Sequence, residues 1–131
     1  MEYLLDSDII IDLLKNKEPG KSIFLNIPQN KKHLSVISWI EIMYGVEKSP
    51  HIARRTNDFV EWMNSFIVQI LNIDVNVAKK FTKLKIHLER IGFKLSDFDL
   101  FVAATAIVHN LTLVTRNVRH FSRIKNLNIL K

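Results

Sequence analysis

The sequence predicts an α/β sandwich built on a mainly parallel sheet, and three observations lead to this class. Short apolar or β-branched runs alternate with longer segments whose apolar residues recur every three or four positions. Only three glycines and three prolines interrupt the chain, and it contains no linker, repeat or low-complexity stretch. Its 131 residues, 47% of them hydrophobic, are enough for one packed core. We therefore expect residues 1–131 to form a single domain.

The first elements follow from local signals near the N-terminus. The apolar run at residues 2–5 predicts a short buried strand, and a helix from residue 7 or 8 to about 15 follows at once. The turn at residues 18–20 starts a second short helical stretch, which Pro28 ends or disturbs. Residues 33–37 come after a polar loop and end in two β-branched side chains, so they predict the second strand.

Helical spacing returns after the second strand. Apolar side chains three and four positions apart predict a helix over residues 38–48, and another helix begins beside Pro50 and carries apolar residues as far as Phe66. Residues 68–73 predict the third strand. Residues 74–90 keep their apolar side chains on one stripe and their cationic ones largely outside it, which predicts an amphipathic, basic helix.

The C-terminal part repeats the alternation. Gly92 is the expected cap of the preceding helix, and a strongly apolar helix follows over residues 97–109. Residues 112–115 predict the fourth strand, residues 118–122 a helical turn and residues 126–130 the closing strand. This order favours parallel pairing, and in parallel sheets ligands bind beyond the carboxyl ends of the strands.

Composition excludes several classes of protein. The chain has no cysteine, so it has neither a disulfide framework nor a thiolate metal site. The N-terminus lacks a basic leader and no apolar tract is long enough to span a bilayer, so we expect a soluble, cytoplasmic protein. Nineteen Lys and Arg residues against 13 Asp and Glu residues give a net charge of +6, which favours an anionic partner such as nucleic acid. Plain solubility remains the alternative explanation of this charge.

Four carboxylates adjoin strongly apolar sequence. Asp6 closes the first strand, Glu41 interrupts an apolar helix, and Asp97 and Asp99 open the helix over residues 97–109. Unpaired buried negative charge is costly and a bound cation is the usual remedy, so all four are expected near the core, at a metal site. Oxygen ligands without cysteine, and histidines without ligand spacing, favour Mg²⁺ or Mn²⁺ over zinc.

Helix capping is the local alternative for each of these acids. Ser38 with Glu41, and Ser96 with Asp99, have the spacing of capping boxes, and Asp6 is placed to cap the first helix. Caps have no reason to gather at one end of a sheet, so the four acids together favour a metal site, and capping is compatible with ligation. A hard cation held by carboxylates on a basic protein predicts phosphodiester hydrolysis.

Four segments resemble, in order, the motifs of PIN-domain nucleases. They are YLLDSDIIIDLL at residues 3–14, SWIEIMYGV at 38–46, SDFDLFVAATA at 96–106 and LVTRNVRHF at 113–121. The likeness covers nearly the whole chain. It is nearest to the VapC type, the ribonuclease toxins of bacterial and archaeal toxin–antitoxin modules.

The resemblance implies a PIN-like α/β/α sandwich with a mainly parallel central sheet and assigns roles to the motif residues. Asp6, Glu41 and Asp99 match the metal-binding acids, and Asp97 matches a frequent additional catalytic acid. Ser7 and Thr115 match hydroxyl positions near the active site. Asn117 stands where many relatives have a fourth acid and toxin-type members often have Asn, so it is expected to bind water or substrate, and Arg116 beside it is expected to bind substrate.

The resemblance also implies an activity and partners. VapC-type proteins are Mg²⁺- or Mn²⁺-dependent endoribonucleases that act on structured RNA, especially tRNA. They usually form homodimers. A cognate VapB-type antitoxin inhibits them by threading its C-terminal segment across the active-site groove.

Two positions on the first helix are harder to assign. Asp8 stands where the family usually has Asn, and it adds negative charge beside Asp6. Asp12 lies one turn further on the same face and is expected to be solvated. Arg116 and Arg119 are the preferred contacts for RNA phosphate, with surface solubility as the alternative for Arg119.

Two rival functions remain open from the sequence. Asp6 and Asp8 after a hydrophobic strand also resemble the start of haloacid-dehalogenase-type phosphatases, although the chain lacks their later lysine and paired-acid loop and has no room for a cap domain. A binding module that keeps the fold without turnover is the non-enzymatic rival. The intact acids at all three core positions argue against it.

Overall fold

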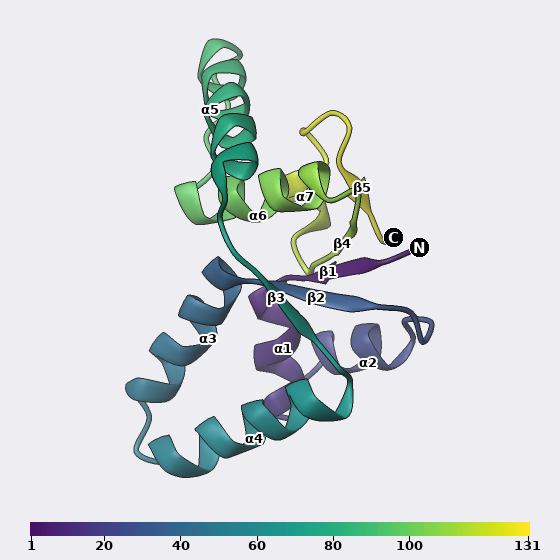
Figure 1. Cartoon of the computed structure of the whole chain (residues 1–131), viewed down its shortest axis with the longest axis vertical. Helices are drawn as coiled ribbons and strands as arrows, with labels where there is room; N and C mark the ends of the chain where they lie inside the picture. The colour runs from purple at the N-terminus through teal and green to yellow at the C-terminus, as the bar shows by residue number, and fades with distance from the viewer.

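The computed structural model describes residues 1–131 and confirms the α/β class (Figure 1). All five strands pair in parallel, and they lie in the order β3-β2-β1-β4-β5. The strands are β1 Tyr3–Leu5, β2 Lys32–Ser35, β3 Gln69–Leu71, β4 Thr112–Val114 and β5 Asn128–Ile129. The helices are α1 Ser7–Leu14, α2 Gly20–Leu25, α3 Val36–Glu47, α4 Ile52–Ser65, α5 Val75–Arg90, α6 Asp97–Val108 and α7 Val118–Phe121. None of them is long and apolar enough to cross a bilayer.

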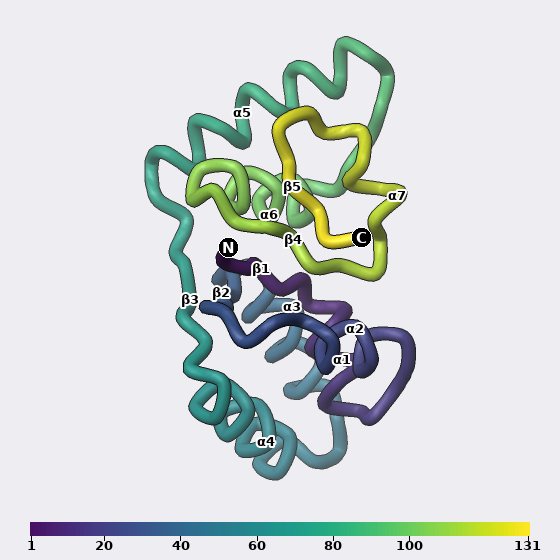
Figure 2. Tube along the Cα trace, turned by 90° about the vertical axis from the view of Figure 1, so that its right-hand side faces the viewer, coloured from purple at the N-terminus to yellow at the C-terminus, as the bar shows by residue number.

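The sheet separates two helical layers. Helices α1 to α4 lie on one side and α5, α6 and α7 on the other (Figure 2). Successive residues of β1 pack into opposite cores: Tyr3 and Leu5 join the core with Trp62, whereas Leu4 joins the core with Phe121. A strand covered on both faces needs apolar side chains at every position, which explains the uninterrupted apolar run that predicted it.

The predicted end of the second strand is wrong. Strand β2 stops at Ser35, and Val36 and Ile37 already belong to α3. Ser35 caps this helix, since its Oγ accepts a hydrogen bond from the Ile37 N–H at 3.1 Å. A good N-cap side chain therefore outweighs the strand preference of the two β-branched residues that follow it.

This shift removes the capping role considered for Glu41. Ser38 lies inside α3, fully buried, so the predicted capping box of Ser38 with Glu41 is wrong. Glu41 is more than one turn past the cap, too far to reach the amides that a cap satisfies. The Glu41 carboxylate therefore does not cap α3 and is available to contact other groups.

The C-terminal elements follow the sequence closely. Ser96 caps α6 by accepting the Asp99 N–H at 3.2 Å. Gly92 adopts φ +73° at the end of α5, a conformation that favours glycine, and the Phe93 N–H donates back to the Leu88 carbonyl, as in a Schellman cap. All five strands contain fewer residues than the sequence predicted.

Asp12 is buried, contrary to the prediction that it is solvated. Its Oδ2 accepts a hydrogen bond at 3.0 Å from the backbone N–H of Gly20, at the start of α2. A Cβ on Gly20 would clash with the Asp12 side chain. Glycine is therefore required here by close approach, and it ties α2 to α1.

We predict opposite effects of alanine at two glycines. Gly20→Ala should lower the free energy of unfolding by about 1–3 kcal/mol, the usual range for an overpacked site. Gly45→Ala, in α3 with nothing within 4 Å of the added Cβ, should raise it by about 0.5–1 kcal/mol because alanine favours the helix. Urea unfolding of both variants measures this. A Gly20→Ala protein as stable as wild type would contradict the close packing of Asp12.

Candidate acidic active site

The parallel sheet brings the ends of β1 and β4 together. Asp6 follows β1 and Thr115 follows β4. The Thr115 hydroxyl donates a hydrogen bond to Asp6 Oδ2 at 2.8 Å, joining residues 109 positions apart. Asp6 also caps α1, because its Oδ1 accepts the Ser7 N–H at 2.8 Å. Capping and a place in the site therefore coincide at Asp6.

Glu41 reaches the same crevice from α3. Its Oε1 accepts a hydrogen bond from the Ser7 hydroxyl at 3.0 Å. Ser7 thus bridges two acids, Asp6 through its backbone N–H and Glu41 through its side chain. Burial raises the pKa of Glu41; the hydrogen bond from Ser7 opposes this, and the negative charge of Asp99 adds to it.

Asp99 comes from the first turn of α6. Its charge raises the pKa of both Asp6 and Glu41, so the three acids lie close enough to sense the same field. The structure gives none of the three a lysine, arginine or histidine partner. The three acids come from three separate elements, and none of them is neutralised by a cationic side chain.

The surroundings of Asp6 disfavour its ionised form. Burial, with only 5% of the residue exposed, raises the pKa of Asp6 to about 7. The charges of Asp8 and Asp99 act in the same direction, and the hydrogen bonds from Thr115 and Ser7 offset them only in part. A carboxylate held ionised at neutral pH in this place calls for a cation.

The donor set suits a hard divalent ion. All the candidate ligands are carboxylate oxygens, which Mg²⁺ and Mn²⁺ prefer. No three carboxylate or imidazole groups lie close enough together to form a preassembled ligand set. Mg²⁺ does not require one, since it usually keeps several waters and takes only one or two carboxylates. The residues therefore fit a partly hydrated ion and not a closed protein cage.

Asp97 lies apart from the other acids. Its side chain is 58% exposed, so the expectation that all four acids lie near the core is wrong for this residue. The Lys85 Nζ, on α5, lies 2.9 Å from Asp97 Oδ1. The structure pairs Asp97 with a lysine, and its catalytic role stays a prediction.

Asp8 has a role that the sequence did not assign. It accepts hydrogen bonds from the Arg116 N–H at 3.2 Å, from Asn117 Nδ2 at 3.3 Å and from the Thr115 hydroxyl at 3.4 Å. These contacts anchor the turn after β4 to α1. Burial raises the pKa of Asp8, which disfavours its ionised form. The three hydrogen bonds are therefore its main contribution to the site.

Arg116 is held by the first helix at both ends. Its backbone N–H donates to Asp8, and its Nη1 lies 3.3 Å from Asp12. The side chain remains 43% exposed, so the guanidinium has further N–H groups for a ligand. The i, i+4 spacing of Asp8 and Asp12 was the sequence signal for this arrangement.

Comparison with known families accounts for this geometry. Residues 3–127 match the PIN domain, and the chain belongs to the PIN-domain family. Within that family its relatives are VapC proteins. The tRNA(fMet)-specific endonuclease VapC of Shigella flexneri is 31% identical over 127 residues, covering 97% of this chain and 95% of that protein. Ribonuclease VapC2 of Rickettsia felis is 30% identical over 130 residues, covering 97% and 95%.

Solved structures agree with the family assignment. VapBC2 from Rickettsia felis, bound to a promoter DNA fragment, superposes with a TM-score of 0.87 at 26% identity, over 99% of this chain and 98% of that chain. DNA-bound VapBC from Salmonella typhimurium gives 0.85 at 28% identity, over 99% and 97%. The predicted PIN-like sandwich and VapC resemblance are confirmed. The chain is a VapC-type nuclease and not a haloacid-dehalogenase phosphatase.

We predict that the ion-free protein loses stability as pH rises from about 4 to 7. The pKa of Asp6 is about 7 in the folded state and about 3.9 in an unfolded chain. Folding therefore favours the protonated form: the full contribution is present below pH 4 and is lost as pH rises towards 7. Asp6→Asn removes this titration.

The measurement is urea unfolding in EDTA at several pH values. The stability of wild type relative to Asp6→Asn should fall across this window. Adding Mn²⁺ at pH 7 should restore part of the loss in wild type alone. A constant difference between the two proteins at all pH values would contradict the raised pKa.

Proposed function

We propose that this protein is a Mg²⁺- or Mn²⁺-dependent endoribonuclease that hydrolyses RNA phosphodiester bonds. One observation carries the proposal: Ser7 links Asp6 to Glu41 through two hydrogen bonds, and neither these two acids nor Asp99 has a cationic partner. The negative charge of Asp99 also raises the pKa of the other two. These three acids are the proposed metal ligands. The names of the VapC relatives support the reaction class.

The chain's own residues hold and orient the acids. Thr115 donates to Asp6, and Ser7 donates to both Asp6 and Glu41, so neither carboxylate is free to turn away from the crevice. A bound divalent ion supplies an activated water and neutralises charge on the phosphate. Substitution of Ser7 or Thr115 should therefore act through the acids.

Arg116 and Asn117 are the proposed substrate contacts beside the acids. Both follow β4 at the same edge of the sheet, and both are tied to Asp8 through donated hydrogen bonds. Arginine offers a planar fork that matches phosphate. Asp97 is proposed as an additional acid, with part of its charge taken by Lys85.

Structured RNA is the proposed substrate class, with tRNA as the first choice. The Shigella flexneri relative is named a tRNA(fMet)-specific endonuclease. The excess of positive charge in this chain would attract any RNA without regard to sequence. The cleaved position must be set by contacts near the acids.

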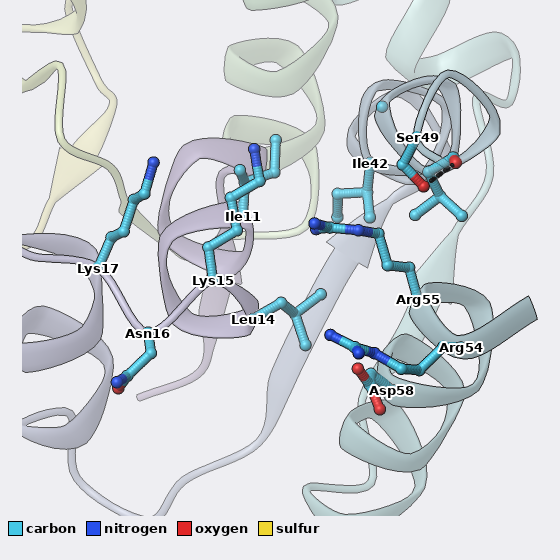
Figure 3. A pocket seen from close by; sticks show the side chains of 12 residues that line it. Ile11, Leu14, Lys15, Asn16, Lys17, Ile42, Ser49, Arg54, Arg55 and Asp58 are labelled. Atoms are coloured by element: carbon cyan, nitrogen blue, oxygen red, sulfur yellow. Dashed lines mark hydrogen bonds between the residues drawn. The ribbon is translucent and has the colours of Figure 1, made fainter. Parts of the chain in front are cut away.

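A VapB-type antitoxin is the proposed partner, and the neighbours solved as VapBC complexes support this. A cavity of about 580 Å³ between α1, α3 and α4 is the proposed docking groove. Figure 3 shows Ile11, Leu14 and Ile42 on its apolar side, with Arg54 and Arg55 facing them. Neither arginine takes part in an ion pair within the chain, so a carboxylate of the partner would complement them.

Two assembly states follow from this proposal. We expect the protein on its own to form a homodimer, as VapC-type proteins usually do, and to form a larger complex when the antitoxin is present. Co-expression with a VapB-type protein followed by size-exclusion chromatography with light scattering measures both. A monomer that takes up no antitoxin would contradict them.

Removal of an acid should abolish RNA cleavage. We expect Asp6→Asn and Asp99→Asn to lower the rate about a hundredfold or more with Mg²⁺ or Mn²⁺, because each deletes a proposed ligand. Cleavage of labelled tRNA on a denaturing gel is the measurement. Thr82→Ala, an exposed change on α5, is the control and should cut normally.

Other results would redirect the proposal. A wild-type protein that binds RNA but never cuts it would be the binding module. Release of inorganic phosphate from small phosphomonoesters, without RNA cleavage, would indicate a phosphatase.

Manganese should stabilise wild type more than Glu41→Gln. An ion that binds only the folded state raises the melting temperature more when it binds more tightly, and loss of one ligand weakens its binding. Thermal melts with and without Mn²⁺ measure the difference. Since Glu41 does not cap α3, an equal shift in both proteins would mean that Glu41 does not hold the ion.

A further inference from the structure

The excess of positive charge lies in one of the two helical layers. From Val75 to the C-terminus the chain carries eleven Lys and Arg residues against three acids, a net +8. The first 74 residues carry eight against ten, a net −2. The last 32 residues contain no acid at all. Residues 75–131, which carry the excess of positive charge, form helices α5, α6 and α7 and strands β4 and β5. The three helices lie above the α1–α4 layer in Figure 2.

A cavity lies within this cationic layer. It has a volume of about 200 Å³ and lies between α5, the C-terminal end of α6 and residues 124–126. Leu84, Leu88, Ile107 and Ile124 contribute its apolar lining, and its polar lining is Lys80, Lys83, His87, Lys125 and Asn126. No carboxylate lines it. We call its three lysines and their cavity the lysine cradle.

The lysines of the cradle have no anionic partner. Neither Lys80, Lys83 nor Lys125 takes part in an ion pair. Lys85, on the neighbouring face of α5, is instead neutralised by Asp97. The cradle therefore contains three ammonium groups whose charge no carboxylate of the chain neutralises.

The fold holds the cradle in a fixed shape. Val77 and Leu88 are buried along α5, and Phe81 stacks on Phe101 of α6 with ring centroids 4.1 Å apart. This packing fixes the rotation of α5, so Lys80, Lys83 and His87 share the face towards residues 124–126. Like charges one turn apart on a helix repel. A surface evolved for solubility alone would intersperse acids among them.

The cradle is separate from the acidic site. Both lie along α6, with Asp99 in its first turn and Ile107 in its last. Eight residues of helix span about 12 Å. One phosphodiester group cannot contact both places, but a continuous RNA strand of several nucleotides can.

We propose that the lysine cradle is a second RNA-binding site that holds the phosphate backbone of a segment flanking the cleaved one. This inference rests on the proposed ribonuclease function. RNA is the occupant because it is the polyanion that the acidic site would hold at the same time. Contacts to phosphate position a substrate without reading its sequence, so the cradle favours long or folded RNA over short fragments.

The test compares two substrates and two charge-matched variants. The substrates are a tRNA transcript that wild type cuts and a hexanucleotide that carries the same cleavage sequence. The cradle variant is Lys80→Gln/Lys83→Gln/Lys125→Gln. The control variant, Lys21→Gln/Lys31→Gln/Lys48→Gln, removes the same charge from the first 74 residues, outside the cradle and outside the cavity proposed for the antitoxin.

The cradle variant should raise KM for the transcript about tenfold with kcat unchanged, and leave KM for the hexanucleotide unaltered. The slope of log KM against log salt should fall by up to about 2, at roughly 0.7 for each phosphate of a single strand that the lysines no longer neutralise. The control variant should do neither.

Three results would overturn the inference. Equal effects of the two variants on the transcript would mean that only net charge matters. Equal effects of the cradle variant on both substrates would mean that these lysines act on the acidic site. A wild-type protein that cuts neither RNA would instead refute the ribonuclease function, and melts of each variant exclude misfolding as the cause.

Discussion

The Asp6 carboxylate, buried at the end of the central strand without a cationic partner, is the constraint around which the site is arranged. The end of β1 is bonded to the end of β4 through Thr115 and to α3 through Ser7 and Glu41. These links hold negative groups together that would otherwise separate. The desolvation that raises the pKa of Asp6 disfavours an ionised carboxylate here unless a cation is bound.

The two layers of the molecule take different parts in this arrangement. The α1–α4 layer supplies Asp6 and Glu41, and the α5–α7 layer supplies Asp99 and most of the positive charge. Helix α3 joins the layers, since Ile42 packs in one core and Ile37 in the other. Lys85 pairs with Asp97, but no lysine pairs with Asp6, Glu41 or Asp99, so the negative charge of these three acids is not neutralised within the chain.

Most of the fold could be predicted from the sequence, because the alternation of strands and helices favours a parallel sheet. The links of Asp6 to Thr115 and, through Ser7, to Glu41 follow from that sheet, whereas the role of Asp6, Glu41 and Asp99 as metal ligands stays a prediction. The start of α3 was misjudged because Ser35 and Ser38 both precede apolar residues. Only the strand pairing of Ser35 with Leu71 decides between them.

The remaining differences came from contacts between distant segments. Asp12 is buried because α2 folds back so that Gly20 meets it. Asp97 is withdrawn from the other acids because α5 presents Lys85 to it. Asp8 gains its contacts only once β4 lies beside β1. The spacing of Asp8 and Asp12 places them on one face of α1, but it does not show which distant segment contacts that face. Sequence reasoning therefore assigned these residues from their immediate neighbours.

Both tryptophans lie in the half of the chain that forms the α1–α4 layer. Trp62 is buried and stacked against Phe59, whereas Trp39 lies on α3 and is partly exposed. Indole emission therefore reports mainly on that layer, because the α5–α7 layer contains no tryptophan. Far-ultraviolet circular dichroism, by contrast, averages over every helix. Disagreement between the two signals during denaturation would show that the halves of this small nuclease come apart one after the other.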